Sequence, residues 1–148
     1  MGNTQRRKIY VIFINIRIGN KMNEINAACL IIEINNKIVA VSRRGSTTQF
    51  GFPGGKVDQG ETPVDAIIRE SFEEIGWKPL DTEIELVYSG HCGSYMVNTY
   101  RYIGIPPSLD SLIAEDNTMI KMLTAEELCY GDISPFSEYN KQVFGELK

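Results

Sequence analysis

Three glutamates, Glu70, Glu73 and Glu74, are spaced so that a helix would bring them together on its surface. Helical side chains three and four residues apart are neighbours at about 5–6 Å. Two negative charges about 6 Å apart repel by roughly 2–3 kcal/mol at an effective dielectric constant near 20. Either solvent screens this repulsion, or a divalent cation such as Mg²⁺ or Mn²⁺ turns it into attraction. Such a pattern alone is more often a solvated acidic face than a metal site.

The sequence also indicates where this helix begins and ends. Thr62 can serve as the N-cap, Pro63 suits the first helical position, and Asp65 completes a capping box. Gly76 favours a stop at the C-terminus. The predicted helix therefore runs from Pro63 to about Ile75. Its predicted apolar face, interrupted by a single serine, consists of Val64, Ile67, Ile68, Ser71 and Ile75, and the acids lie on another face beside Ala66.

The residues before the helix favour a ligand at this place. Residues 50–52 read as a short strand that Pro53 ends. Gly54 and Gly55 then allow a tight loop whose backbone can lie close to a ligand, with Lys56 beside it. A strand, a glycine loop and an acid-lined helix in this order form a place where phosphates and metals can meet.

Residues 55–77 resemble the Nudix box, written G-x5-E-x7-R-E-U-x-E-E-x-G-U with U apolar. The matching positions are Gly55, Glu61, Arg69, Glu70, Glu73, Glu74, Gly76 and Trp77. The one departure is Ser71, which stands where the box has an apolar residue. Because this position lies on the predicted buried face of the helix, the departure concerns packing and leaves the chemistry intact.

The resemblance implies an α/β fold, the α/β/α Nudix sandwich with a mixed sheet, over residues 22–148. It also implies Mg²⁺- or Mn²⁺-dependent hydrolysis of the pyrophosphate bond in a nucleoside diphosphate derivative. The wording of residues 52–57 is similar to that of members that cleave nucleoside triphosphates or oxidised nucleotides. ADP-ribose and dinucleoside polyphosphates are alternative substrates, and a non-catalytic domain that senses nucleotides is a further alternative.

By the same resemblance, the box residues take separate roles. Glu73 is the family-based choice of general base, although in this family the base can also lie outside the box. Arg69 is expected to orient a box glutamate through an ion pair, and with Glu70 it completes the expected catalytic group. The expected metal ligands are Glu70, Glu73 and Glu74, with the Gly55 carbonyl and Glu61 in support.

Residues outside the conserved box positions complete the expected site. Arg44, at the end of a predicted strand, and Lys56 are candidates for contacts with substrate phosphates. Tyr95 lies eighteen residues after the box, about where some hydrolases of dinucleoside polyphosphates place a tyrosine. Glu115 and Asp116 occupy the region where many relatives carry another acid, which makes them a second location for a general base. For each of these residues, a solvated or structural role is the alternative.

Composition places limits on the partners. The chain has 148 residues, 43% of them hydrophobic, which suits one globular domain. A net charge of −4 argues against broad binding of nucleic acids or anionic membranes, so a small nucleotide is the expected substrate. The three cysteines, Cys29, Cys92 and Cys129, form no C-x-x-C pair, which favours reduced thiols in the cytoplasm.

The N-terminal extension, residues 1–21, needs a separate interpretation. Every even position from Tyr10 to Ile18 is apolar, whereas Asn15 and Arg17 are polar, so this stretch predicts a strand with one buried face. It is too short to span a membrane as a helix. We expect an added strand at a sheet edge or across a homodimer. Alternatively, translation begins at Met22 and the extension is not essential.

Alternating and continuous apolar runs predict the remaining elements. Residues 27–34 and Lys37–Ser42 read as strands joined by a hairpin turn at Asn35 and Asn36. Further strands are expected near residues 84–89, 96–103 and 120–123, and a capping box at Thr124 and Glu127 predicts a short helix. A terminal helix is expected after Ser137. This order of strands and helices supports an α/β layer with a mixed sheet.

Overall fold

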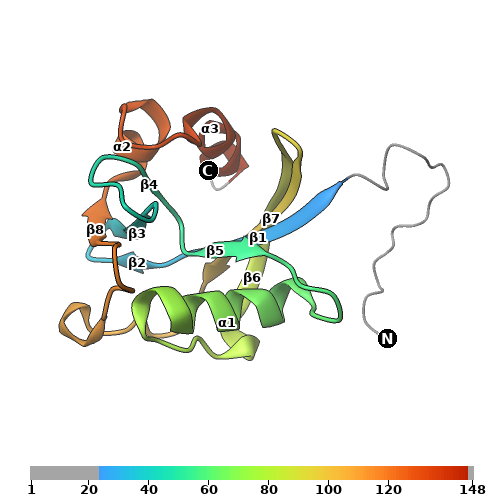
Figure 1. Ribbon diagram of the computed structural model, residues 1–148, viewed down its shortest axis with the longest axis horizontal. Coiled ribbons are helices and arrows are strands. Elements are labelled where there is room, and N and C mark those ends of the chain that lie inside the picture. Colours follow the sequence, from blue (N-terminus) through green and yellow to red (C-terminus); the bar gives the residue numbers. More distant parts are fainter. Residues whose placement is uncertain (1–23, 147–148) are drawn as a thin grey trace, which may run out of the picture.

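The computed structural model describes residues 24–146, so the strand expected within residues 10–18 lies outside the described residues. The described chain forms three layers, in which α1 lies on one side of the sheets and α2 and α3 lie on the other (Figure 1). One sheet has the strand order β5-β1-β7-β6, and β1 runs parallel to β7 but antiparallel to β5. The second sheet is antiparallel, with β3 pairing β2, β4 and β8. This arrangement confirms the predicted α/β sandwich with a mixed sheet.

The strands and helices have the following bounds. The strands are β1 Ile25–Ile31, β2 Glu33–Ile34, β3 Lys37–Ser42, β4 Phe50–Gly51, β5 Gly54–Lys56, β6 Ile84–Cys92, β7 Tyr95–Tyr102 and β8 Ile120–Leu123. The helices are α1 Pro63–Ile75, α2 Ala125–Tyr130 and α3 Ser137–Glu146, with single 3₁₀ turns at Asp81–Glu83 and Leu109–Ser111. No helix among residues 24–146 is both long and apolar enough to cross a membrane.

The second half of β1, from Ala28, and nearly all of β3 are buried on both faces, which explains their continuous apolar sequences. In β1, Ala28 and Leu30 pack in the cluster under α1, whereas Ile31 packs in the cluster under α2 and α3. In β3, Val39 belongs to the first cluster and Ala40 to the second. Since successive side chains of a strand point to opposite faces, one run of apolar residues supplies both cores.

The predicted hairpin is confirmed, but its first strand is divided. Asn35 and Asn36 adopt positive φ angles of 53° and 65°, as the two central residues of a type I′ turn require. The predicted strand over residues 27–34 is interrupted at Ile32, where the chain leaves the first sheet as β1 and enters the second as β2. The periodicity of buried side chains cannot show this change of sheet, because Ile32 is fully buried as well.

Helix α1 has the predicted ends. The amide of Asp65 donates to Thr62 Oγ1 at 3.0 Å, and the amide of Thr62 donates to Asp65 Oδ2 at 3.2 Å. Gly76 ends the helix with a φ of 72°, in the left-handed region that favours glycine. The second predicted capping box, at Thr124 and Glu127, also forms and begins α2.

The predicted buried face of α1 is confirmed at Ile67, Ser71 and Ile75 and differs at the remaining positions. The buried residues are Ala66, Ile67, Ser71 and Ile75, whereas Val64 and Ile68 are only half-buried. The small residue Ala66 is thus part of the helix face that packs on the sheet. Glu70 and Glu74 also lie toward β5, where Glu70 is beside Gly55 and Glu74 accepts a hydrogen bond from the Gly54 amide.

Ser71 is fully buried, and its Oγ atom has no hydrogen-bond partner among residues 24–146. We expect Ser71→Ala to raise the free energy of unfolding by about 1 kcal/mol, because a buried hydroxyl without a partner is costly and alanine favours the helix. Urea denaturation with an unchanged slope would measure this gain. Ser89→Ala, on the exposed part of β6, is the matched control and should change stability by less than about 0.5 kcal/mol. A loss of stability in Ser71→Ala would contradict the argument.

Candidate metal and phosphate site

The guanidinium of Arg69 is the centre of the candidate site. Its Nε and Nη2 atoms donate to the two carboxylate oxygens of Glu61 at 2.7 and 3.0 Å, and Nη1 donates to Glu70 Oε2 at 3.0 Å. Nη2 also donates to the carbonyl oxygen of Lys56 at 3.1 Å. Paired charge-assisted hydrogen bonds of this kind are stronger than neutral ones and define orientation. The hydrogen bond from Arg69 holds the pKa of Glu61 below its usual value.

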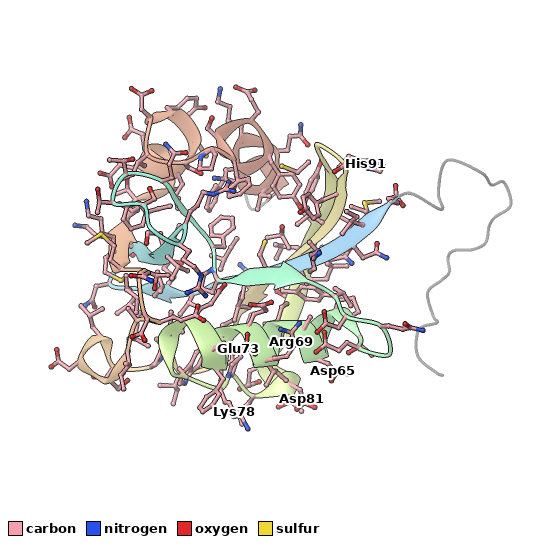
Figure 2. The ribbon with its side chains drawn as sticks, in the orientation of Figure 1. Asp65, Arg69, Glu73, Lys78, Asp81 and His91 are labelled. Carbon is pink, nitrogen blue, oxygen red and sulfur yellow. The ribbon has the colours of Figure 1, made fainter. Side chains whose placement is uncertain are left out.

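The same guanidinium connects α1 with the loop between β5 and α1, residues 57–62, here called the box loop. Glu61 accepts a hydrogen bond from the amide of Asp58 at 2.9 Å, and its own amide donates to the Asp58 carbonyl at 3.0 Å. Asp58 Oδ2 lies 3.4 Å from Arg69 Nη2, and Glu73 Oε1 lies 3.6 Å from Nη1. Figure 2 shows Arg69 and Glu73 along α1. The expected role of Arg69, to orient box glutamates, is therefore consistent with its contacts.

Two glycines let β5 lie close to both β1 and α1. The amide of Gly54 donates to Glu74 Oε1 at 2.9 Å. A Cβ atom on Gly55 would lie 2.5 Å from Glu70 Oε2, and one on Gly54 would clash with the carbonyl oxygen of Ala28. Gly54 and Gly55 were predicted to form a loop, but they belong to β5 and pair with β1. The glycines serve close packing of a strand between a neighbouring strand and a helix.

Burial of Glu70 and Glu74 changes their acidity. Burial raises the pKa of Glu74 to about 8, and the negative charges of Glu70, Glu115 and Glu73 add to the increase. Burial also raises the pKa of Glu70, although Arg69 opposes this shift. Both shifts mean that this site disfavours negative charge without a compensating cation. The side chain of Glu73, in contrast, is half exposed.

The donor set has the chemistry of a site for a hard divalent cation. Its members are carboxylates and a backbone carbonyl, which are the ligands that Mg²⁺ prefers. Within residues 24–146, however, no three acidic, histidine or cysteine side chains already converge into a group that could hold a metal. Arg69 holds Glu70, and the Gly54 amide holds Glu74. The residue types fit a metal, and carboxylate rotations would be needed to bring them together.

A loop before β8 brings two further predicted residues to the C-terminal end of α1. The amides of Ile113 and Glu115 donate to the carbonyls of Ile75 and Glu74, at 2.9 and 3.3 Å. The Glu115 carboxylate in turn lies 3.0 Å from the Arg44 guanidinium. Arg44, Glu74 and Glu115 therefore lie at one end of the site, although they are far apart in sequence.

The structure does not bring every predicted residue to the acids. The side chain of Lys56 is exposed at β5, and only its carbonyl contacts Arg69. Tyr95 begins β7 opposite Cys92, at the tip of the β6–β7 hairpin. His91 belongs to the same hairpin and lies in the upper part of Figure 2, whereas Glu73 and Arg69 lie in its lower part. Tyr95 is accordingly remote from the box acids.

Sequence reasoning missed one participant, Asp58, and the contact of Gly54 with Glu74. Asp58, which pairs with Arg69, stands at a position that the box pattern leaves unspecified. Gly54, whose amide binds Glu74, precedes the first box residue. Their roles depend on how β5 and the loop after it lie against α1. A surface hollow of about 330 Å³ lies beside Arg69 and Glu73, lined also by Phe72 and Lys78.

The fold and site agree with a comparison against protein families. The family model of the NUDIX domain matches residues 22–106, which is more than half of the 148-residue chain. The chain therefore belongs to the NUDIX domain family.

Curated relatives match a shorter stretch. The RNA pyrophosphohydrolase of Francisella tularensis subsp. mediasiatica (strain FSC147) is 42% identical over 59 residues, which cover 40% of this chain and 37% of that protein. The 8-oxo-dGTP diphosphatase of Escherichia coli (strain K12) is 37% identical over 62 residues, which cover 39% of this chain and 48% of that protein. In both cases the match spans less than half of the relative.

Solved structures share the fold over most of the chain. The solution structure of the ORF135 protein of E. coli has a TM-score of 0.66 at 24% identity, covering 88% of this chain and 94% of that one. A MutT structure from work on the proteins of Aliivibrio salmonicida and Vibrio cholerae has a TM-score of 0.64 at 20% identity, covering 83% and 98%. At these identities the likeness concerns the fold alone.

The raised pKa of Glu74 predicts that the metal-free protein loses stability as the pH rises from about 4.5 to about 8. In this range the folded state keeps a proton on Glu74 and the unfolded state does not. The contribution of this proton to the free energy of unfolding is therefore complete below pH 4.5 and is lost toward pH 8. Thermal unfolding in EDTA between pH 5 and 9 would measure it, and Glu74→Gln should flatten the profile.

Glu126→Gln, on the exposed surface of α2, is the control for this measurement and should keep the wild-type profile. Addition of Mg²⁺ at pH 8 should restore stability in the wild-type chain more than in Glu74→Gln. A profile that is equally steep in Glu74→Gln would contradict the assignment.

Proposed function

We propose that this chain is a Mg²⁺- or Mn²⁺-dependent hydrolase of a pyrophosphate bond in a nucleoside diphosphate derivative. The observation that carries the proposal is the placement of Glu70 and Glu74 against the backbone of Gly54 and Gly55. Two carboxylates are partly buried there at the cost of raised pKa values, which a purely structural helix face would not require. The names of the curated relatives, an RNA pyrophosphohydrolase and an 8-oxo-dGTP diphosphatase, support the same reaction class.

The metal would be held by Glu70, Glu73 and Glu74, with the Gly55 carbonyl as a further ligand. When bound, it would supply Lewis-acid stabilisation of the negative charge that develops on the phosphate oxygens. Glu61 supports this set through Arg69, since both of its carboxylate oxygens accept hydrogen bonds from the guanidinium. Arg69 in turn keeps Glu70 at β5.

Two residues are available to accept the proton of the attacking water. Glu73 is half exposed and lies beside an open hollow, so water can reach its carboxylate. Glu115 is the alternative, since its backbone is hydrogen-bonded to Glu74 at the end of α1. We propose Glu73 as the general base, because Glu115 lies 3.0 Å from the Arg44 guanidinium, whereas Glu73 is farther, at 3.6 Å, from that of Arg69.

Arg44 is the proposed contact for substrate phosphates. Its side chain is 60% exposed, and an exposed ion pair such as that with Glu115 contributes little free energy. A phosphate with more than one negative charge can therefore compete for the guanidinium. Lys56 is a second contact, from the exposed edge of β5.

The proposed substrate is a small nucleotide, a nucleoside triphosphate or an oxidised nucleotide. The acidic chain lacks the positive charge that long nucleic acids require. The remote position of Tyr95 removes one reason to favour dinucleoside polyphosphates. ADP-ribose, a 5′-triphosphorylated RNA and a sensing role without turnover are the competing proposals. A cytoplasmic location is also proposed, from the odd number and wide spacing of the cysteines.

Phosphate release across a panel of nucleotides tests the proposal. The panel contains nucleoside triphosphates, oxidised dGTP, ADP-ribose, diadenosine polyphosphates and a short RNA with a 5′ triphosphate, each with Mg²⁺, Mn²⁺ or EDTA. We expect cleavage of a nucleoside triphosphate or of oxidised dGTP that stops in EDTA. Tight binding of one nucleotide without any turnover would instead establish the sensing role.

Glu73→Gln is expected to lower kcat by a factor of at least about 100, because general bases contribute on the order of 10²–10⁴ to the rate. The thermal stability should remain unchanged, since the side chain is half exposed. Glu138→Gln, on the exposed surface of α3, is the matched control and should keep full activity. An unchanged kcat in Glu73→Gln would reject its role and direct attention to Glu115.

A further inference from the structure

A cavity of about 440 Å³ lies beside the point where the chain passes from the first sheet to the second, and the proposed function makes no use of it. Both sheets and α3 line it, through residues that include Ile31 of β1, Glu33 of β2, Ile38 of β3, Arg101 of β7 and Phe144 of α3. It lies on the side of the sheets that α2 and α3 cover, whereas α1 and its carboxylates lie on the other side (Figure 1). Small-molecule sites occupy about 300–1,000 Å³, so the volume suits a small ligand.

Part of the cavity wall is apolar. Ile31 and Ile38 are buried members of the cluster under α2 and α3, and the half-buried ring of Phe144 packs on this cluster. Ile103, just after β7, also lines the cavity and is 52% exposed, although it is a large apolar residue. An aromatic ring beside aliphatic side chains is a surface on which a flat ring system can stack. The body of a matching ligand is therefore flat and apolar.

Arg101 supplies hydrogen-bond donors to the cavity. Within residues 24–146, its only hydrogen bond runs from Nε to Glu85 Oε1, at 2.9 Å. The Arg101 side chain is 48% exposed, and an exposed ion pair of this kind contributes little free energy. The two Nη atoms are thus free to donate to a ligand. A guanidinium binds best to two neighbouring acceptors on one edge of a flat ring, such as O6 and N7 of guanine.

Glu33 supplies acceptors from the neighbouring sheet. Ile31 pairs with Arg101 in the first sheet, and Glu33 follows two residues later, a distance of about 7 Å along an extended chain. The exposed carboxylate of Glu33 can accept from two neighbouring N–H groups. A simple anion would be repelled by Glu33, and a simple cation by Arg101. The matching ligand therefore has acceptors on one edge and donors on the next.

We propose that this cavity binds the guanine base of a nucleoside or nucleotide, as a second site apart from the carboxylates of α1. Arg101 donates to O6 and N7, Glu33 accepts from N1–H and the N2 amine, and the base stacks beside Phe144. The ribose points to solvent, so a phosphate is not required for binding. The proposal does not depend on hydrolysis, because the cavity contains none of the residues proposed as metal ligands, general base or phosphate contacts.

Titration of the full chain with guanosine tests the proposal, with the amide signals of the ¹⁵N-labelled protein recorded in EDTA. Guanosine has no phosphate and therefore no bond that the proposed hydrolysis could cleave. We expect saturable shifts at residues 31–38 and 101–103. Adenosine should bind at least about tenfold more weakly, because it has an amino group in place of O6 and no donor at N1. Equal binding of adenosine would overturn the proposal, as would shifts confined to residues 69–74 or no shift up to the solubility limit.

Two variants assign the contacts. Arg101→Gln and Glu33→Ala should each weaken guanosine binding at least about tenfold, since each removes a bidentate contact with the base. Lys141→Gln, an exposed cation of α3 outside the cavity, is the matched control and should keep the affinity. Thermal unfolding without ligand checks that the variants remain folded. Unchanged affinity in Arg101→Gln and Glu33→Ala would overturn the proposal.

Inosine gives a readout that a loss of folding would not produce. Inosine lacks the N2 amine of guanosine, so the wild-type chain should prefer guanosine over inosine. Glu33→Ala should lose this preference, whereas Arg101→Gln should keep it, because both ligands have O6 and N7. A preference that persists in Glu33→Ala would contradict the assigned orientation of the base.

Discussion

The hydrogen bonds from Arg69 to Glu61, Glu70 and the carbonyl of Lys56 are the interaction on which the rest of the site depends. They join β5, the box loop and α1, which approach one another only after the chain has folded. A guanidinium suits this position because its donors lie in one plane with fixed angles, so each bond that forms orients the next. One cation thereby gives two carboxylates their orientation and compensates part of the negative charge around it.

The second constraint is the short distance between α1 and β5. Glu70 reaches the strand because Gly55 has no side chain there, and Gly54, whose amide binds Glu74, has no side chain that would clash with β1. The same closeness partly removes both carboxylates from water, which raises their pKa values. A site of this kind is costly for the apo protein and favourable once positive charge is present. The cost is consistent with selection for ligand binding, since a solvated acidic face would avoid it.

Local sequence signals predicted the ends of α1, the start of α2, the Asn35–Asn36 turn and strand β3, because caps and turns depend on side chains within four residues. The signals failed where an element depends on its neighbours. Gly54 and Gly55 were predicted to form a loop, although pairing with β1 makes them a strand. Periodicity predicted a buried face of α1 that includes Val64 and Ile68. In the structure these two residues are half-buried, and Ala66 is buried.

The sequence by itself determined the chemical content of the site, because the spacing of Arg69, Glu70, Glu73 and Glu74 on a capped helix is a local property. Only the tertiary structure decided which of these side chains are buried. It also brought Arg44 and Glu115 to Glu74, and it placed Tyr95 at the tip of the β6–β7 hairpin. Those relations depend on segments that lie far apart in the chain. Such segments meet only when sheet pairing and helix packing bring them together, and spacing along the sequence carries no information about that meeting.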